Sequence, residues 1–330
     1  MTVFRASVIC VLLAARTVLG QVEDWPDYRT VAADLQVPQM MKAEPAAGQR
    51  VRRNLPQYDS NVYYALYLPS DWQPGKSYPV IVEYAGNGGY QDPLGDECSG
   101  RPEDCNLGYG MSAGVGFIWI CLPYLNNNGN DLTITWWGDA PAYDPQPTLK
   151  FCRAAVADVC ANFGGDSGRV MLSGFSRGAI ACNYLGLFDD ETSRLWRAFV
   201  PCSHYDGVRR WPYPDSDAAA AAMRLKRLQE RPQFICGERD QIEETRKYLA
   251  SFELQHITFA STGFRNHSDQ WILRPSPTRD RLREWLTEVI RAPKSTAKPP
   301  TAKPSTAKPS TASPSTASPS TPKPPTPNPQ

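Results

Sequence analysis

Histidine is scarce in this sequence, and no Cys-x-x-Cys pair occurs in it. The chain of 330 residues contains only 3 histidines. Zinc sites are usually built from closely spaced cysteines and histidines, so these two absences exclude the common zinc motifs. The sequence also has no glycine-rich loop that leads into a lysine and could cradle a phosphate. We therefore expect neither a metal ion nor a cofactor.

A strong charge of one sign and a long hydrophobic run are also missing. The formal net charge is +1, and Arg5, Arg16 and five lysines near the C-terminus account for more than that excess. The part between is therefore mildly acidic, which argues against nucleic acid as a partner. The apolar run from Ala6 to Ala15 ends at Arg16. A membrane span needs ~20 predominantly apolar residues, so we expect none here.

The first twenty residues have the pattern of a signal peptide. Arg5 is followed by the apolar run, and Val18-Leu19-Gly20 offers compact residues for cleavage. A membrane anchor is the alternative, and the shortness of the run disfavours it. We predict a signal peptide over 1–20 and a secreted, extracellular protein.

The C-terminal segment repeats a five-residue unit of the form STAKP or STASP. No apolar side chain larger than alanine occurs in it, so it cannot bury a core, and we expect disorder over 293–330. Whether this tail is an O-glycosylated stalk or an unmodified linker is left open. Between leader and tail, residues 21–292 have the size of one α/β domain.

Eight cysteines remain once Cys10 of the leader is set aside. An even number in an oxidising compartment predicts disulfide bonds. Cys98 and Cys105 lie in a loop rich in Gly, Pro and Asp that can close on itself, so this pair is the bridge that we expect first.

Strand-like and helix-like segments alternate along the body. Strands are predicted at 61–68, 78–84, 116–122, 169–173, 198–202, 233–236 and 255–260, the first two as neighbours, and helices at 148–163, 218–230, 242–252 and 279–290. This alternation predicts an α/β fold with a mostly parallel central sheet and helices on both of its faces. Ligands of such sheets bind at the carboxyl ends of the strands.

A Gly-x-Ser-x-Gly motif, GFSRG at 174–178, lies between the RVMLS strand and a segment that can form a helix. In this context the motif is a nucleophile elbow. The turn is so tight that its first and last positions, 174 and 178, require a residue as small as glycine. It presents the Ser176 hydroxyl at the top of the sheet. A turn serine without chemistry is the competing interpretation, which the flanking strand and helix disfavour.

At these residues the chain resembles the α/β-hydrolase superfamily, and within it secreted esterases of the feruloyl-esterase and polyester-depolymerase kind. The resemblance is carried by YYALYLPSDW, YPVIVEYAGNGG and VMLSGFSRGA, and it covers most of 61–290. It implies an acid after a later strand and a histidine in a loop before the last helix.

Both are present in the expected order. His267 lies in a polar loop before the closing helix, where it can serve as the base that activates Ser176. For the acid, the resemblance favours Asp240 in the turn after the 233–236 strand. Glu238 in the same turn and Asp206 after the 198–202 strand remain alternatives. The carboxylate would hold the imidazole tautomer and stabilise its charged form.

Other residues are candidates for the oxyanion hole and the substrate site. One oxyanion donor is expected from the N–H of Arg177 and the other from Asn87, although many relatives have His-Gly at the latter place. Trp136 and Trp137 are candidates for an aromatic platform over the cleft, with core packing as the alternative, and His204 for its lining. Asn266-His267-Ser268 matches the glycosylation signal, but a glycan beside the base would block access, so we expect it to be unused.

The sequence therefore predicts a serine esterase with a Ser-His-Asp triad, Ser176, His267 and Asp240, that forms an acyl-enzyme. Its expected partner is a small-molecule or polysaccharide-linked ester. The alternatives are a serine peptidase on the same fold and an inactive hydrolase-like protein used for binding or adhesion. Substrate identity and oligomeric state are left open.

Overall fold

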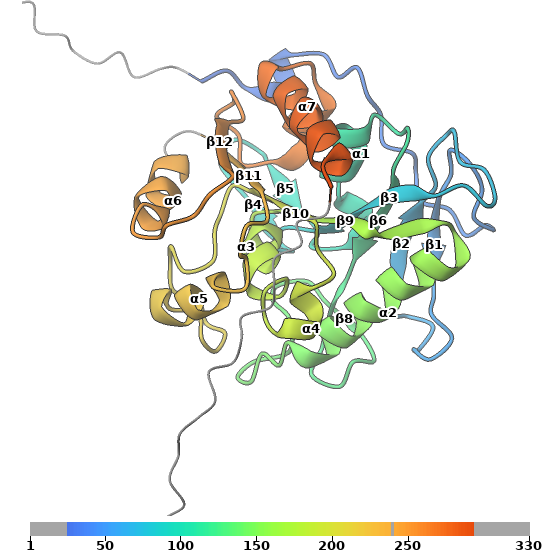
Figure 1. Cartoon of the computed structure of the whole chain (residues 1–330), viewed down its shortest axis with the longest axis horizontal. Coiled ribbons are helices and arrows are strands. Elements are labelled where there is room, and N and C mark those ends of the chain that lie inside the picture. The colour runs from blue at the N-terminus through green and yellow to red at the C-terminus, as the bar shows by residue number, and fades with distance from the viewer. Residues whose placement is uncertain (1–24, 239–240, 294–330) are drawn as a thin grey trace, which may run out of the picture. The chain divides into compact units, whose positions relative to one another are not determined.

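The computed structural model describes residues 25–238 and 241–293, which all lie in one compact unit. A sheet of eight strands in the order β1-β2-β6-β3-β9-β10-β11-β12 runs through this part of the chain (Figure 1). The strands are β1 (Arg50–Arg53), β2 (Tyr64–Tyr67), β6 (Ile118–Leu122), β3 (Tyr78–Tyr84), β9 (Gly165–Phe175), β10 (Ala198–Cys202), β11 (Gln233–Gly237) and β12 (Ile257–Ser261). The mostly parallel sheet predicted from the sequence is confirmed.

The central strands are rich in apolar residues because both of their faces are covered. Every residue of β3 and β6 is buried. β3 pairs in parallel with β6 on one side and with β9 on the other. A strand in that position needs apolar side chains on both faces, which explains the continuous apolar run GFIWICL and the mostly apolar YPVIVEY.

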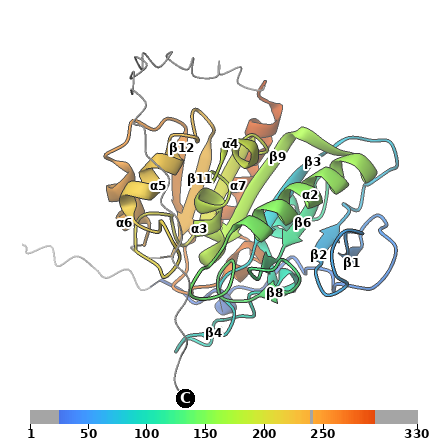
Figure 2. The ribbon, with the colours of Figure 1, turned by 90° about the horizontal axis from the view of Figure 1, so that it is seen from below.

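Helices pack on both faces of the sheet (Figures 1 and 2). α1 (Leu107–Ser112) and α7 (Pro277–Arg291) contribute Leu107 and Leu282 to the hydrophobic core of one face. α2 (Gln146–Asn162) and α3 (Arg177–Tyr184) contribute Leu149 and Ile180 to the core of the other. The remaining α-helices are α4 (Asp190–Ser193), α5 (Ala218–Leu225) and α6 (Gln241–Leu249).

The prediction that the strands at 61–68 and 78–84 are neighbours in the sheet is wrong. β2 and β3 are not adjacent, because β6 lies between them. β6 pairs antiparallel with β2, as in the register Leu66↔Ile120, and parallel with β3. The crossover through α1 returns the chain beside β3 and so inserts β6 at that place. Among the eight strands of this sheet, only β2 runs against the direction of the others. β1 pairs antiparallel with β2 and therefore points the same way as β6.

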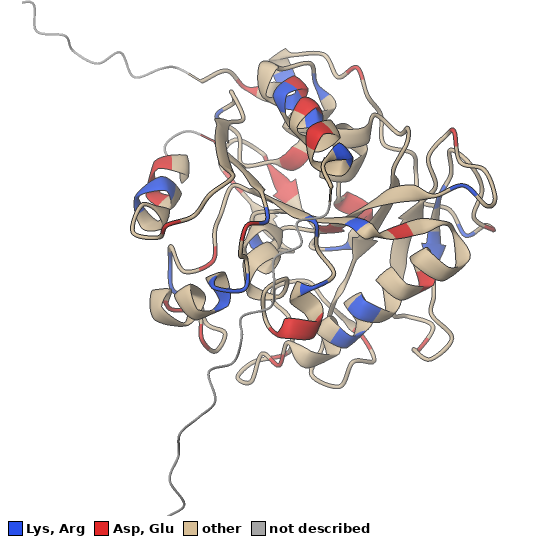
Figure 3. Cartoon of the chain, in the orientation of Figure 1, with Lys and Arg blue, Asp and Glu red and all other residues tan. Residues whose placement is uncertain are grey.

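The predicted signal peptide, and the predicted tail beyond Pro293, lie outside the described residues. Within the described part of the chain, no helix is both long and apolar enough to cross a membrane. Acidic and basic residues are interspersed over the ribbon, and α7 carries both signs (Figure 3).

Candidate active site

Ser176 occupies a strained turn between β9, which ends at Phe175, and α3, which begins at Arg177. Its backbone angles are φ 52° and ψ −112°. A non-glycine residue rarely adopts positive φ, and such strain persists only where the surrounding structure enforces it. Ser176 is also largely buried, with 7 % of its surface exposed. The predicted strand-turn-helix setting of this serine is confirmed.

The two glycines of the motif are required by close backbone contacts. A Cβ at Gly174 would lie 2.2 Å from the carbonyl oxygen of Gly178, and a Cβ at Gly178 would lie 2.0 Å from that of Tyr84. No side chain fits at such distances. The elbow therefore packs directly against the end of β3, as expected of a turn that must keep both glycines.

His267 lies on the loop between β12 and the 3-10 helix η3 (Asp269–Leu273), and it faces Ser176. Its Nε2 is 2.9 Å from Ser176 Oγ. The rings of Phe175 and Tyr90 flank the imidazole, with centroid distances of 4.8 Å and 5.2 Å. The imidazole is thus held within hydrogen-bond reach of the hydroxyl, the position that a general base requires.

The carboxylate on the other side of the imidazole is that of Glu238, directly after β11. Glu238 Oε1 accepts a hydrogen bond from His267 Nδ1. This contact was expected from Asp240, and the expectation is corrected in favour of the alternative in the same turn. Asp240 itself lies outside the described residues. The longer side chain of Glu, starting one residue after the end of the strand, spans the gap to the imidazole.

Ser203 fixes the second oxygen of this carboxylate, a role that the sequence analysis missed. Its Oγ donates to Glu238 Oε2 over 2.5 Å. Ser203 directly follows β10, the strand beside β11, and its φ is 83°. Burial opposes ionisation of Glu238, but the hydrogen bonds from His267 and Ser203 outweigh it and lower the pKa of the carboxyl below its usual value. The sequence could have indicated this role, because Ser203 is a polar residue at the end of β10, the neighbour of the strand that leads to Glu238.

Asp206, the third candidate for the acid, has a different partner. Its carboxylate forms a buried ion pair with Arg224, at 2.9 Å. Burial raises the pKa of Asp206 to about 6, against the opposing effect of Arg224. A carboxylate held in this way is a structural ion pair, and we exclude it as the partner of His267.

The two expected oxyanion donors belong to neighbouring segments. Arg177 opens α3, so its N–H has no partner within the helix. Asn87 lies in the loop after β3, and no hydrogen bond from its N–H to another described residue is present. Both amides are therefore free to bind an oxyanion.

A polar cavity opens beside the imidazole. Its volume is about 290 Å³, and it is lined by Tyr90, Asp92, Leu94, His204, Glu238, Gln241, Arg265 and His267. The prediction that His204 lines the cleft agrees with this cavity. Burial and the neighbouring His267 lower the pKa of His204 to about 4, so its ring is neutral at neutral pH. A larger hollow of about 500 Å³, between Tyr58 and Arg153, contains none of these residues.

Trp136 and Trp137 belong to the core rather than to an aromatic platform. They are only 6 % and 0 % exposed. Trp137 stacks on Tyr184 of α3 with ring centroids 4.6 Å apart, and Trp136 contacts Trp211 at 5.3 Å. The expectation of substrate contact is corrected, because burial of these large apolar rings stabilises the fold more than exposure would.

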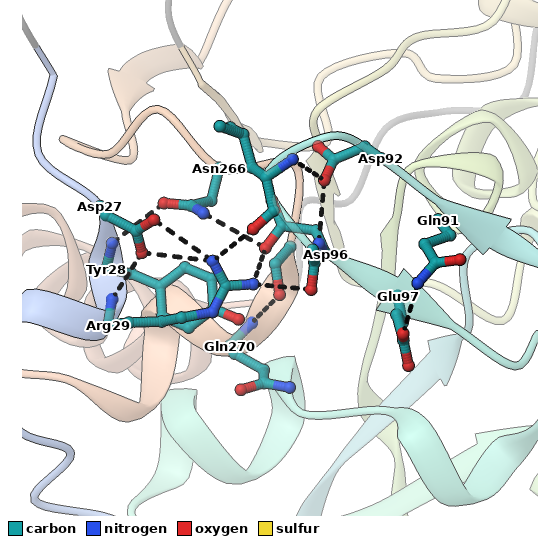
Figure 4. Close-up of polar contacts among 12 residues, drawn as sticks. Asp27, Tyr28, Arg29, Gln91, Asp92, Asp96, Glu97, Asn266 and Gln270 are labelled. Atoms are coloured by element: carbon teal, nitrogen blue, oxygen red, sulfur yellow. Dashed lines mark hydrogen bonds and ion pairs between the residues drawn. The ribbon is translucent and has the colours of Figure 1, made fainter.

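The loop that carries His267 is tied to the N-terminal segment through the residue before it (Figure 4). Asn266 Oδ1 accepts from the Tyr28 amide at 3.0 Å, and Asn266 Nδ2 donates to Asp96 at 3.2 Å. Arg29 also donates to Asp96, at 2.7 Å. Asn266 is 2 % exposed. Its buried, doubly bonded amide cannot carry a glycan in the folded protein, which agrees with the expectation that the signal is unused.

All eight described cysteines are free thiols, so the expected Cys98–Cys105 bridge is not formed in this structure. Cys105 lies instead beside Cys121 and Glu83, the three donors of one buried cluster that could hold a metal ion. The carboxylate of Glu83 already accepts hydrogen bonds from the Gly108 amide and the Trp119 indole, both at 2.8 Å. Arg50 donates to Cys121 Sγ, and a cation there opposes metal binding.

Comparison with known proteins adds support for the fold. Neither a protein-family model nor a curated protein matches the chain by sequence. Among solved structures, an S-formylglutathione hydrolase from Agrobacterium tumefaciens is similar, with 15% identity and a TM-score of 0.50, over 75% of this chain and 98% of its own.

Two further solved structures are less alike. A thermostable esterase has 16% identity and a TM-score of 0.44, over 72% of this chain and 62% of its own. An acylaminoacyl peptidase from Pyrococcus horikoshii has 12% identity and a TM-score of 0.48, over 74% and 42%. The chain thus spans less than two thirds of either protein. With the sheet order and the elbow, the comparison with the S-formylglutathione hydrolase shows that this chain has the α/β-hydrolase fold.

Proposed function

We propose that the protein is a serine hydrolase that cleaves carboxylic esters through an acyl-enzyme. The observation that carries the proposal is the chain of contacts from Ser176 Oγ to His267 Nε2, at 2.9 Å, and from His267 Nδ1 to Glu238. A serine hydroxyl is a poor nucleophile until a neighbouring base removes its proton, and a buried carboxylate keeps that base in the required tautomer. The strain at Ser176 supports the same role.

The proposed reaction has two halves. Ser176 Oγ attacks the ester carbonyl as its proton passes to His267 Nε2, and the amides of Arg177 and Asn87 bind the resulting oxyanion. The tetrahedral intermediate collapses to the acyl-enzyme, and His267 returns the proton to the departing alcohol. Water, deprotonated by His267, then attacks the acyl group and releases the acid.

The resemblance of YYALYLPSDW, YPVIVEYAGNGG and VMLSGFSRGA to secreted esterases supports a carboxylic ester as the substrate. We propose extracellular action on a small-molecule or polysaccharide-linked ester. Secretion rests on the pattern of the first twenty residues. N-terminal sequencing of protein recovered from the medium of an expressing cell tests it, because secretion predicts a start near Gln21.

The experiment compares wild type, Ser176→Ala and Ser251→Ala on p-nitrophenyl acetate and on a peptide p-nitroanilide. Ser251 is an exposed serine, which makes it a matched control. We expect turnover of the ester by wild type and by Ser251→Ala, and none above background by Ser176→Ala at an unchanged melting temperature. Ester turnover that survives Ser176→Ala contradicts the proposal, and faster turnover of the anilide than of the ester contradicts the substrate class.

A further inference from the structure

The side chain of Arg177, the residue after Ser176, is buried without an acidic partner. It is 1 % exposed, and its guanidinium lies over the ring of Tyr124, 3.7 Å from the centroid. No ion pair joins it to a carboxylate among the described residues. Nε and Nη1 lack hydrogen-bond partners there. A buried charge without a counter-ion is costly, so its presence next to the nucleophile calls for a reason other than stability.

The polar contacts of this guanidinium are backbone carbonyls of two loops. Nη2 donates to the carbonyl oxygen of Gly86 at 2.8 Å and to that of Gly100 at 3.4 Å. Gly86 belongs to the loop after β3, which abuts the elbow, since Gly178 lies against the carbonyl of Tyr84. The side chain therefore links the start of α3 to the loop that carries the second oxyanion donor.

The carbonyl of Gly86 and the N–H of Asn87 belong to the same peptide group. In a trans peptide these two groups point in opposite directions, and the Gly86–Asn87 bond is trans. A hydrogen bond that fixes the carbonyl therefore also fixes the direction of the N–H, away from the guanidinium. On the far side of Asn87, the amide of Gly88 donates to the carbonyl of Ile134 at 2.5 Å. The Asn87 amide thus lies between two anchored peptides and stays free itself.

We propose that the Arg177 side chain is a positioning residue, which orients the Asn87 N–H toward the oxyanion through its hydrogen bond to the Gly86 carbonyl. The inference rests on the proposed function, because it concerns the oxyanion hole of the same site. One residue then serves the oxyanion twice: its backbone N–H binds the charge, and its side chain aims the partner donor. A preorganised donor of this kind acts mainly in the transition state.

The test is a double-mutant cycle with Arg177→Met and Asn87→Pro. Methionine keeps an unbranched, apolar side chain of similar reach without any donor, whereas proline at 87 removes the N–H and leaves the Gly86 carbonyl in place. Arg246→Met, at a half-exposed arginine on α6, is the control for loss of an arginine. For each variant, kcat and KM for p-nitrophenyl acetate, affinity for an alkyl trifluoromethyl ketone, and the melting temperature are measured. The ketone reports on the oxyanion hole because its adduct with Ser176 carries an oxyanion.

We expect Arg177→Met to lower kcat by ~10²-fold, the loss typical of one oxyanion donor, with little change in KM. Affinity for the trifluoromethyl ketone should fall by a similar factor. In the Asn87→Pro background, Arg177→Met should have almost no further effect, because its route to the oxyanion is already lost. Effects that multiply in the double variant, or a ketone affinity that stays at the wild-type value, overturn the inference.

If Arg177→Met does not fold, Arg177→Leu takes its place in the cycle, since leucine also lacks any donor to the Gly86 carbonyl. Inactive wild type, or wild-type turnover by Ser176→Ala, refutes the proposed function. An active enzyme with an additive cycle refutes the role of Arg177 alone.

Discussion

Replacing Glu238 with Gln removes the negative charge that faces His267 and changes the size of the side chain little. In the structure the carboxylate accepts two hydrogen bonds, from His267 Nδ1 and from Ser203 Oγ. With Ser203 still donating to one oxygen, the amide nitrogen of Gln faces Nδ1 and donates to it. The imidazole must then carry its proton on Nε2, where it cannot accept the proton of Ser176.

The expected decrease in kcat follows from the loss of the correct tautomer and the loss of the negative charge. A wrong tautomer together with loss of the charge that stabilises the imidazolium lowers kcat by up to ~10⁴-fold in comparable triads. That factor corresponds to about 5.5 kcal/mol at the transition state. KM should change much less, since Glu238 lies behind the imidazole and holds the base rather than the acyl group.

The assay is steady-state hydrolysis of p-nitrophenyl acetate near neutral pH, with melting temperatures for every variant. Asp240→Asn is the matched control, a carboxylate-to-amide change two residues away. We expect Glu238→Gln to lose most of its kcat and Asp240→Asn to keep it. A collapse at Asp240→Asn together with a mild effect at Glu238→Gln would refute the assignment of the acid.

Four further changes to the chain have expected outcomes of their own. Ser203→Ala should lower kcat about tenfold, because one charged hydrogen bond to Glu238 is lost; unchanged kcat would show that Glu238 needs no such support. Trp137→Ala should destabilise the protein by about 4 kcal/mol in chemical denaturation, because a large buried aromatic side chain is lost, while the folded fraction keeps its KM. A raised KM at unchanged stability would instead indicate that Trp137 contacts the substrate. The pKa of His204 is low in the folded protein, so as the pH falls its imidazole takes up a proton in the unfolded chain first. The free energy of unfolding should therefore fall by about 3 kcal/mol more in wild type than in His204→Gln between pH 6.5 and pH 4. A parallel pH dependence of the two proteins would contradict this. Deleting 294–330 should leave kcat and melting temperature unchanged, since that segment has no large apolar side chain to bury, and a fall of more than a few degrees would argue against it.

Local patterns were sufficient to predict most of the sheet and the strand-turn-helix setting of Ser176. Mostly apolar runs mark β3 and β6 because both faces of those strands are buried, and only Glu83 interrupts the run of β3. The GFSRG motif carries its own geometric requirement, since two of its residues must be glycine for the turn to pack on β3. The place of His267 beside Ser176 could be predicted because the sequence has only 3 histidines.

The missed features depend on contacts between distant segments. Choosing Glu238 over Asp240 requires knowing where β11 ends relative to the imidazole, and a difference of two residues is beyond what a loop sequence defines. The insertion of β6 between β2 and β3 is a property of the crossover and leaves no mark in either strand. Trp136 and Trp137 lie in a polar, glycine-containing segment that looks like a surface loop, yet the rings of Tyr184 and Tyr213 cover them.

Labelling with a fluorophosphonate probe, followed by peptide mass spectrometry, shows directly whether Ser176 is an activated nucleophile. The probe forms a bond from phosphorus to an activated serine oxygen and releases fluoride, so it reports the nucleophile without knowledge of the substrate. We expect a single labelled serine, Ser176, with labelling abolished in Ser176→Ala and strongly slowed in His267→Gln and Glu238→Gln. A folded wild-type protein that takes up no label, or one that carries it on another serine, would contradict the assignment of Ser176 as the nucleophile.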